Sequence, residues 1–225
     1  LDQLIAAIKS KEVVEYTEGK FTNSYPSKNI RIAVDRNQVI KNKVVAPKMY
    51  DSIVPFMDID IKGSNLIKNR MIMLDILANN NWKRPICFTG GSFGDDDYIW
   101  LKDYLQLDGL VYKLVPVKTP KTKDSSPLDM GLIDSDKMIK IIKSWDWGNG
   151  ENPNIYHDPE TRRNAITYRT NVARLMEQLI NEGRNQDAEE IMDLIIRKMP
   201  VDYYGFYTSL EPYIIGYYKI EKKDK

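Results

Sequence analysis

Cysteine and histidine are nearly absent from this chain, which holds one residue of each type, Cys87 and His157. A single cysteine excludes an intramolecular disulfide, so cysteine usage does not report the redox compartment. One cysteine and one histidine also argue against a zinc site built from the usual ligands. We therefore expect neither a metal nor a cofactor.

Long apolar runs and a surplus of one charge are missing as well. No apolar stretch approaches the roughly 20 residues that span a bilayer, and no signal peptide is present. The 33 basic and 32 acidic residues leave a net charge of +1, which does not favour nucleic acid as a partner. The chain opens on LDQLIAAIKS without methionine, so we interpret it as part of a longer protein, about whose targeting the missing signals say nothing.

Hydrophobic residues make up 42% of the 225 residues, enough to build a packed core. Alternation of apolar and polar residues predicts half-buried strands at 30–34 and 57–61. On the second strand, Asp58 and Asp60 share one face. They could share a metal ion or an acid/base task, although the solvent face of an edge strand is the favoured interpretation.

The most strongly patterned region runs from Ser64 to Val117. Its spacing predicts a helix at 64–79, a strand at 86–89, a helix at 98–107 ended by Gly109, and a strand at 110–117. Strand, helix and strand in this order predict a parallel pair. We expect an α/β or α+β fold over residues 1–150, with a small mixed sheet and flanking helices.

After residue 150 the sequence becomes helical. We predict helices at 159–181, 186–197 and 204–220, and expect residues 151–225 to form a separate unit. Small and apolar residues along the first two helices resemble a tetratricopeptide-type hairpin. One hairpin and part of another fit this pattern, which indicates a repeat-like unit rather than an array.

The glycine-rich turn TGGSFGDDD at 89–97 follows a strand, where backbone amides can hold a phosphate. Its three aspartates, Asp95, Asp96 and Asp97, would repel an anion, yet they could hold Ca²⁺ or Mg²⁺. A plain strand-to-helix turn with acidic residues at the helix start explains the same pattern and is favoured. The spacing matches neither a Walker loop nor a dinucleotide fingerprint.

Aromatic residues supply the other candidate site. Exposed tryptophan and tyrosine beside Asp and Asn can form a platform on which a sugar stacks, or the rings can form the seam between the two halves, which we favour. Our candidate ligand-binding residues are Asp95, Asp96, Asp97, Trp82, Trp100 and Arg84. We assign no catalytic residue, because Cys87 lies in an apolar strand and His157 sits at a helix start capped by Asp158.

Three segments carry a resemblance to a known family: MLDILANNNWKRPICF, YLQLDGLVYKLVPV and IYHDPETRRNAITYRTNVARLMEQLINEG. Together they resemble the C-terminal soluble part of large multi-pass membrane proteins of unknown function from Bacteroidetes, over most of residues 50 to 215. The N-terminal membrane part of that family is similar to protein O-mannosyltransferases. The chain departs from the family at Cys87, where an aromatic residue is expected, and at His157-Asp158, where Leu-Asp is common.

The resemblance implies context rather than catalysis, because the membrane part that would hold the transferase acid is absent from these residues. It implies a location on the periplasmic face of the inner membrane, anchored by the parent chain. We therefore expect a non-catalytic accessory domain of a glycosyltransferase-like protein that binds an acceptor protein, a glycan or a partner subunit. The alternative is an enzyme domain that binds a nucleotide-sugar or a metal at the turn from Gly90 to Asp97.

Overall fold

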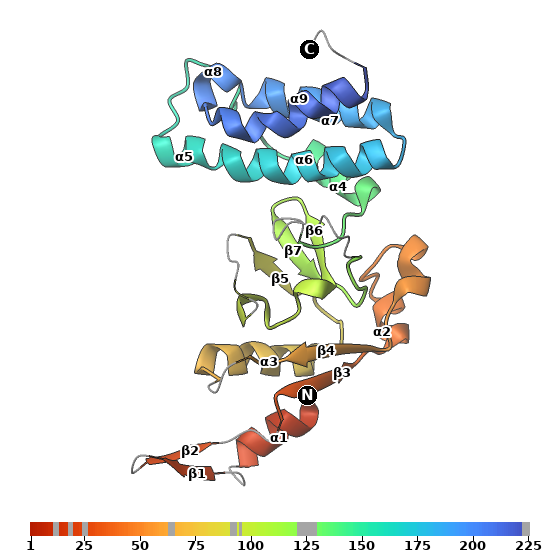
Figure 1. Ribbon diagram of the computed structural model, residues 1–225, viewed down its shortest axis with the longest axis vertical. Coiled ribbons are helices and arrows are strands. Elements are labelled where there is room, and N and C mark those ends of the chain that lie inside the picture. Colours follow the sequence, from red (N-terminus) through yellow and green to blue (C-terminus); the bar gives the residue numbers. More distant parts are fainter. Residues whose placement is uncertain are drawn as a thin grey trace. The chain divides into compact units, whose positions relative to one another are not determined.

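The computed structural model describes residues 1–10, 14–17, 20–23, 27–62, 66–90, 94, 96–120 and 130–221 (Figure 1). The chain divides into two compact units, of which the first comprises Leu1–Gln106 and Tyr112–Leu132 and the second Leu107–Val111 and Ile133–Lys225. The mixed α/β class with a helical C-terminal part is confirmed. The chain passes from the first unit to the second for the last time between Leu132 and Ile133. The domain boundary expected near residue 150 and the separate folding of each part stay predictions.

The first unit begins with helix α1 (Asp2–Ser10) and the antiparallel pair β1 (Val14–Thr17) and β2 (Lys20–Asn23). Strands β3 (Asn29–Ala33) and β4 (Phe56–Asp60) then form a second antiparallel pair, as their alternation predicts. Every second side chain is buried on both strands, including Ile30 opposite Ile59. On the exposed face Arg31 lies opposite Asp58 and donates a 2.8 Å hydrogen bond from Nε to its carboxylate, so Asp58 is a cross-strand ion-pair partner.

Short elements connect these strands to the rest of the unit. Helix α2 (Arg36–Lys41) is capped by Asp35, whose carboxylate accepts from two backbone N–H groups, and the 3₁₀ segment η1 (Pro47–Ser52) follows. A cluster of buried aliphatic residues lies beneath them: Val39, Val44, Val45, Ile53, Val115 and Val117. Helix α3 (Lys68–Asn80) buries Leu74 and Leu77 and confirms the predicted helix, although Ser64 lies outside the described residues.

The helix predicted at 98–107 is wrong. After β5 (Cys87–Thr89), the chain forms two 3₁₀ turns, η2 (Asp96–Tyr98) and η3 (Lys102–Tyr104), and then strand β6 (Leu105–Asp108). Ile99 and Trp100 both take positive φ values, 53° and 56°, which no helix accommodates. The segment is a strand rather than a helix because nearly every side chain of β6 is buried.

Gly109 is therefore not a helix C-cap but the turn of a β-hairpin between β6 and β7 (Val111–Leu114). Its φ of +67° suits glycine, and a Cβ there would lie 2.9 Å from the Ile141 side chain. The three strands form a sheet of order β5-β7-β6. An Asp-Gly pair between apolar residues is a hairpin signal, and here it outweighs the helical spacing.

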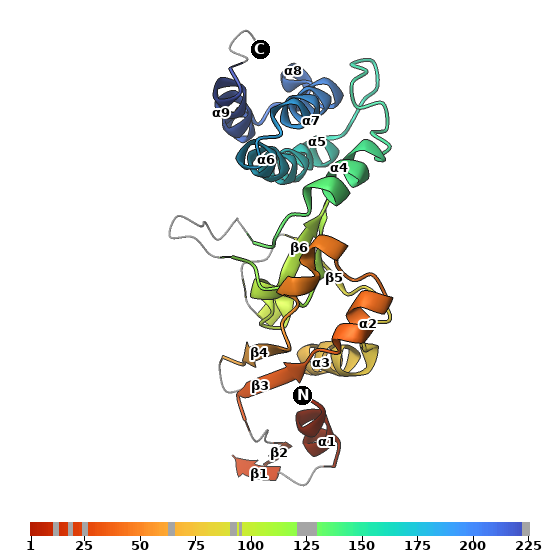
Figure 2. The same ribbon diagram turned by 90° about the vertical axis from the view of Figure 1, so that its right-hand side faces the viewer.

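The second unit contains α4 (Ser135–Lys143), α5 (Pro159–Arg163), α6 (Ala165–Asn181), α7 (Asn185–Lys198), α8 (Val201–Tyr204), η4 (Tyr207–Leu210) and α9 (Glu211–Lys219). Helices α6 and α7 form the predicted hairpin, joined at Gly183 with φ +74°. Figure 2 looks nearly along α6, α7 and α9, which pack side by side. The predicted helix at 159–181 is interrupted at Asn164. The one predicted at 204–220 is divided among the end of α8 at Tyr204, the 3₁₀ segment η4 and α9.

A buried arginine joins several segments of the second unit through hydrogen bonds. Arg169 on α6 is 0% exposed, and its guanidinium donates to the carbonyl oxygens of Gly205 at 2.6 Å and Met199 at 2.9 Å. Burial lowers the pKa of Arg169. Tyr213 on α9 returns a hydrogen bond to the Arg169 carbonyl at 2.6 Å, so this one residue links α6 to the chain before and within α9.

Candidate binding site

The turn after α3 positions the residue at the centre of the site, Trp82. Asn81 and Trp82 both adopt left-handed backbone conformations, with φ of 43° and 58°. Two hydrogen bonds close the turn: the Asn80 side-chain amide donates to the Arg84 carbonyl at 2.8 Å and accepts from the Arg84 N–H at 3.2 Å. A bulky residue with positive φ is uncommon and is held only where neighbouring contacts fix it. The half-buried indole packs against the aliphatic cluster beneath α2.

Trp82 lines a cavity of about 730 Å³ within the first unit. The end of α3, the start of α1 and the strand β3 with the residues after it form its walls. This volume falls within the range of small-molecule sites, roughly 300–1,000 Å³. The lining is rich in amide, carboxylate and guanidinium groups beside the single indole: Asp2, Gln3, Arg31, Asp35, Asn80 and Asn81.

Several of these polar groups already have structural partners. The Arg31 guanidinium binds Asp58 and lies over the Phe56 ring, 5.2 Å from its centroid. Asp35 caps α2. Gln3 and Asn81 have no hydrogen-bonding partner among the described residues, and both are exposed. The cavity therefore combines a fixed polar frame with side-chain amides that can bond a ligand.

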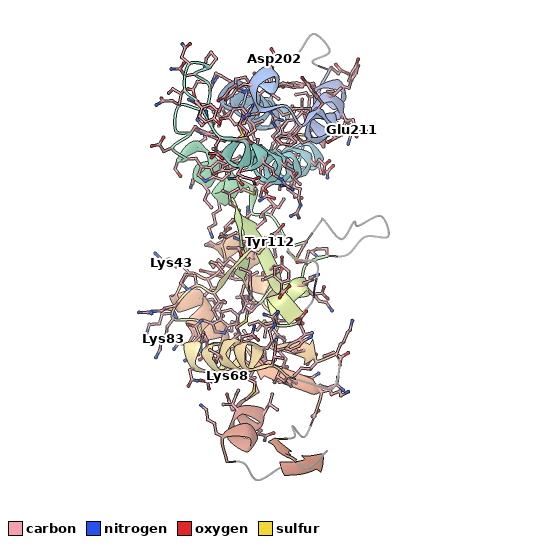
Figure 3. The ribbon with its side chains drawn as sticks, turned by 90° about the vertical axis from the view of Figure 1, so that its left-hand side faces the viewer. Lys43, Lys68, Lys83, Tyr112, Asp202 and Glu211 are labelled. Carbon is pink, nitrogen blue, oxygen red and sulfur yellow. The ribbon has the colours of Figure 1, made fainter. Side chains whose placement is uncertain are left out.

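A second, smaller cavity of about 170 Å³ shares Trp82 and Asn80 with the first. Lys83, Arg84 and Lys113 are the charged residues of its lining, and no carboxylate lines it. The Lys113 ammonium donates to the Val44 carbonyl, whereas Lys83 is exposed at the surface (Figure 3). The structure thus brings together two of the residues predicted from sequence, Trp82 and Arg84.

The aspartates of the predicted turn have a different role. Asp95 lies outside the described residues, while the carboxylates of Asp96 and Asp97 both accept hydrogen bonds from Arg70 on α3, that of Asp96 at 3.1 Å. The Arg70 side chain is only 14% exposed. Among the described residues, no cluster of His, Cys, Asp or Glu has the arrangement of a metal site. Asp96 and Asp97 line neither cavity, and nor does Trp100.

The aromatic residues of the second unit pack on one another. Trp145 lies 5.2 Å, centroid to centroid, from both Trp147 and Tyr168. His157 stacks edge-on against Tyr203, whose hydroxyl accepts from the His157 backbone N–H at 2.8 Å. Asp158 caps α5, as its place in the sequence predicts. A seam between the halves stays a prediction.

The sequence analysis missed two residues that line the cavities, Asn80 and Lys113. It also missed Arg70, which binds the aspartates of the turn. Asn80 follows the predicted helix at 64–79, and asparagine commonly bonds backbone groups where a helix ends. Lys113 and Arg70 carry no local signal, because their partners are distant in the chain. Arg70 meets Asp96 and Asp97 only after the chain has folded back.

The fold comprises an α/β unit with two cavities, followed along the chain by a helical unit. Residues 1–137 match the family described as TMEM260-associated domain 2, and the chain belongs to that family. The match includes the NWKRP and YLQLDGL motifs, but the resemblance over 155–183 lies beyond it. No curated protein and no solved structure matches the chain. Within the described residues, no helix is both long and apolar enough to cross a membrane.

Proposed function

We propose that this chain is a non-catalytic accessory domain of a membrane glycosyltransferase-like protein and that it binds a glycan in the cavity beside Trp82. The observation that carries the proposal is the cavity itself, in which one indole stands among side-chain amides and carboxylates. The apolar C–H face of a sugar ring packs on an aromatic ring, while its hydroxyl groups bond amides and carboxylates. The glycan would be that of an acceptor protein.

The resemblance supplies the context of this proposal. The family of the chain and the likeness to parents with an O-mannosyltransferase-like membrane part support a role beside such a membrane part. In that setting the domain would lie on the periplasmic face and hold the acceptor near the membrane. The alternative of an enzyme site at the glycine-rich turn has less support, because Arg70 binds the carboxylates of Asp96 and Asp97.

The test is binding of α-linked mannobiose to the whole chain, followed by NMR of the indole N–H groups, with cellobiose as the comparison sugar. We expect weak binding, with a Kd on the order of 1 mM, because a disaccharide offers few apolar atoms. Trp82→Ala should weaken binding at least tenfold. Gln3→Ala, which changes an exposed residue of the cavity wall, should weaken it without changing stability.

Trp100→Phe is the matched control, because Trp100 is also half-buried and left-handed but lines neither cavity. The native affinity should persist in this variant. Equal loss of binding in the Trp100 and Trp82 variants would contradict the assignment of the cavity. Binding of neither sugar by the native chain would contradict the glycan proposal, and turnover of a sugar substrate by the chain would contradict its non-catalytic part.

A further inference from the structure

Three segments that the fold brings together form the walls of the small cavity beside Trp82: the turn after α3, the residues after α2, and strand β7. The Leu114 N–H on β7 donates to the Ile86 carbonyl at 2.8 Å and holds the strand against the end of the turn. From the same strand the Lys113 ammonium donates to the carbonyl of Val44, which follows α2. Hydrogen bonds thus fix the three walls relative to one another.

The charged side chains of this lining are all cationic. They are Lys83 and Arg84, which are adjacent in the turn, and Lys113, which the fold brings from further along the chain. Trp82 and Ile86 contribute apolar surface between them. Cations gathered in a hollow with low-dielectric walls produce a positive potential that concentrates anions. The small cavity therefore has the charge pattern of an anion site.

Arg84 differs from the other arginines of the first unit. Arg31, Arg36 and Arg70 each form an ion pair with an aspartate, at 2.8, 3.5 and 3.1 Å. In the part of the chain that the structure describes, neither Arg84 nor Lys83 has an ion-pair partner. Both residues are exposed, so a ligand can reach their donors without breaking an existing pair.

The size of the cavity and the number of its cations select among anions. Its volume of about 170 Å³ lies below the roughly 300–1,000 Å³ of sites that enclose a whole small molecule, so it suits a single group. A phosphate monoester carries a charge of about −1.5 to −2 at pH 7 and three strong acceptor oxygens. A carboxylate has one charge and two oxygens. Three cationic side chains therefore favour the monoester.

We propose that the small cavity binds the phosphate group of a phosphate monoester. The Arg84 guanidinium offers the planar pair of donors that matches two phosphate oxygens, and the Lys83 ammonium acts as a point charge. The half-buried Lys113 supplies positive charge from the wall formed by β7. Asn80 positions Arg84, because its side-chain amide bonds the Arg84 main chain on both sides.

The molecule that carries the phosphate is a sugar. Trp82 and Asn80 line both cavities, so the two cavities adjoin. A sugar ring packed on Trp82 in the large cavity places a phosphate substituent in the small one. The identity of the carrier rests on the glycan-binding proposal, whereas the phosphate site does not.

The first experiment titrates inorganic phosphate into the whole chain at low ionic strength and follows the backbone N–H signals of residues 82–86 by NMR. We expect a Kd on the order of 1 mM and shifts centred on these residues. Arg84→Gln and Lys83→Gln should each weaken binding about fivefold or more, because each removes a charge-assisted contact. Arg84→Lys should recover part of the loss, because the charge remains and the planar fork does not.

Lys68→Gln is the matched control. Lys68 is an exposed lysine at the start of α3, roughly 18 Å along the helix from Asn80 at its end, which is beyond the screening length of about 10 Å. This variant should keep the native affinity. An affinity that is unchanged in Arg84→Gln, or that falls equally in Lys68→Gln, would overturn the site.

Two further anions test the charge of the ligand. Acetate and dimethyl phosphate each carry a single negative charge, so both should bind about fivefold more weakly than phosphate or worse. Equal binding of acetate would show a carboxylate site, and equal binding of dimethyl phosphate would show a diester site. Either result would overturn the assignment to a monoester.

The last experiment tests the carrier with mannose 6-phosphate and phosphoserine. Mannose 6-phosphate should bind about tenfold more tightly than inorganic phosphate, because its ring contacts become intramolecular. Gln3→Ala, which changes the large cavity alone, should weaken binding of mannose 6-phosphate and leave that of inorganic phosphate unchanged. Phosphoserine binding as tightly as mannose 6-phosphate would overturn the sugar as carrier. Binding of inorganic phosphate without binding of mannobiose would contradict the glycan proposal alone, and the reverse would contradict the phosphate site alone.

Discussion

Arginine plays opposite parts in the two units of this chain. In the second unit Arg169 is fully buried and donates to main-chain carbonyl oxygens. In the first unit the Arg31 side chain is 64% exposed and pairs with Asp58, itself 61% exposed. Removing a buried guanidinium leaves buried acceptors without a hydrogen-bond donor. The partners of an exposed guanidinium can bond water instead, so its removal costs less. The difference predicts that similar ion and hydrogen-bond contacts contribute very unequally to stability.

The first unit also contains an intermediate case. The Arg70 side chain is 14% exposed, but its two partner carboxylates, Asp96 and Asp97, are 52% and 41% exposed. Because both aspartates lie in the segment between β5 and β6, Arg70 holds that segment in place rather than the core. The three arginines therefore form a series of increasing exposure on which the comparison can be tested.

The largest effect should come from Arg169→Leu. The substitution removes the donor from the buried Met199 carbonyl and from the partly buried Gly205 carbonyl, so we expect the free energy of unfolding to fall by about 3 kcal/mol. Urea unfolding followed by circular dichroism measures this. Arg169→Lys should recover only part of the loss, because an ammonium cannot reproduce the planar fork. Arg197→Leu, an exposed arginine on α7, is the control. An equal fall in the free energy of unfolding for Arg197→Leu would show that burial does not decide how much an arginine contributes.

Arg70→Leu should have a smaller effect, about 1 kcal/mol, because water solvates the two carboxylates once the arginine is gone. The measured quantity is again the free energy of unfolding. Without the arginine between them the two neighbouring carboxylates repel each other more strongly, so Asp96→Asn in the Arg70→Leu background should recover part of the loss. If instead Asp96→Asn destabilised that background further, the carboxylate would have a partner more important than Arg70.

Sequence patterns predicted the elements whose signal is local. Strands β3 and β4 followed from alternation, and the α6–α7 hairpin followed from helical spacing interrupted around Gly183. The segment 98–107 failed because a short apolar run fits a helix as well as a buried strand. The positive φ values of Ile99 and Trp100 depend on tertiary packing, and neither residue type predicts them.

The candidate site was predictable only in part. Trp82 and Arg84 belong to a motif with a recognisable composition, and both line the smaller cavity. Lys113 joins them through the fold, from a strand some distance along the chain. The role of Asp96 and Asp97 could not be read from their spacing either, because Arg70 lies one helix earlier. Local patterns thus identify residues, whereas long-range pairing decides what they do.

The smallest effect in the series should come from Asp58→Asn, which breaks the exposed pair with Arg31. The hydrogen bond from Arg31 lowers the pKa of Asp58 below its ordinary value. A carboxylate whose folded pKa is lowered stabilises the fold above its unfolded pKa, about 3.9, and this contribution is lost as pH falls through the folded pKa. The native chain should therefore differ slightly from the variant at pH 7, and the difference should shrink as the pH falls below about 3.9 toward the folded pKa of Asp58.

Urea midpoints of the two proteins, measured between pH 7 and pH 3, test this directly. Because both side chains are exposed, 1 M NaCl should remove the difference at pH 7 as completely as acid does. Ala33→Ser, an uncharged change on β3, the strand that carries Arg31, should show neither dependence. A difference at pH 7 that survives 1 M salt would mean that the Arg31–Asp58 pair contributes through packing over Phe56, and exposure would then fail to rank the three arginines.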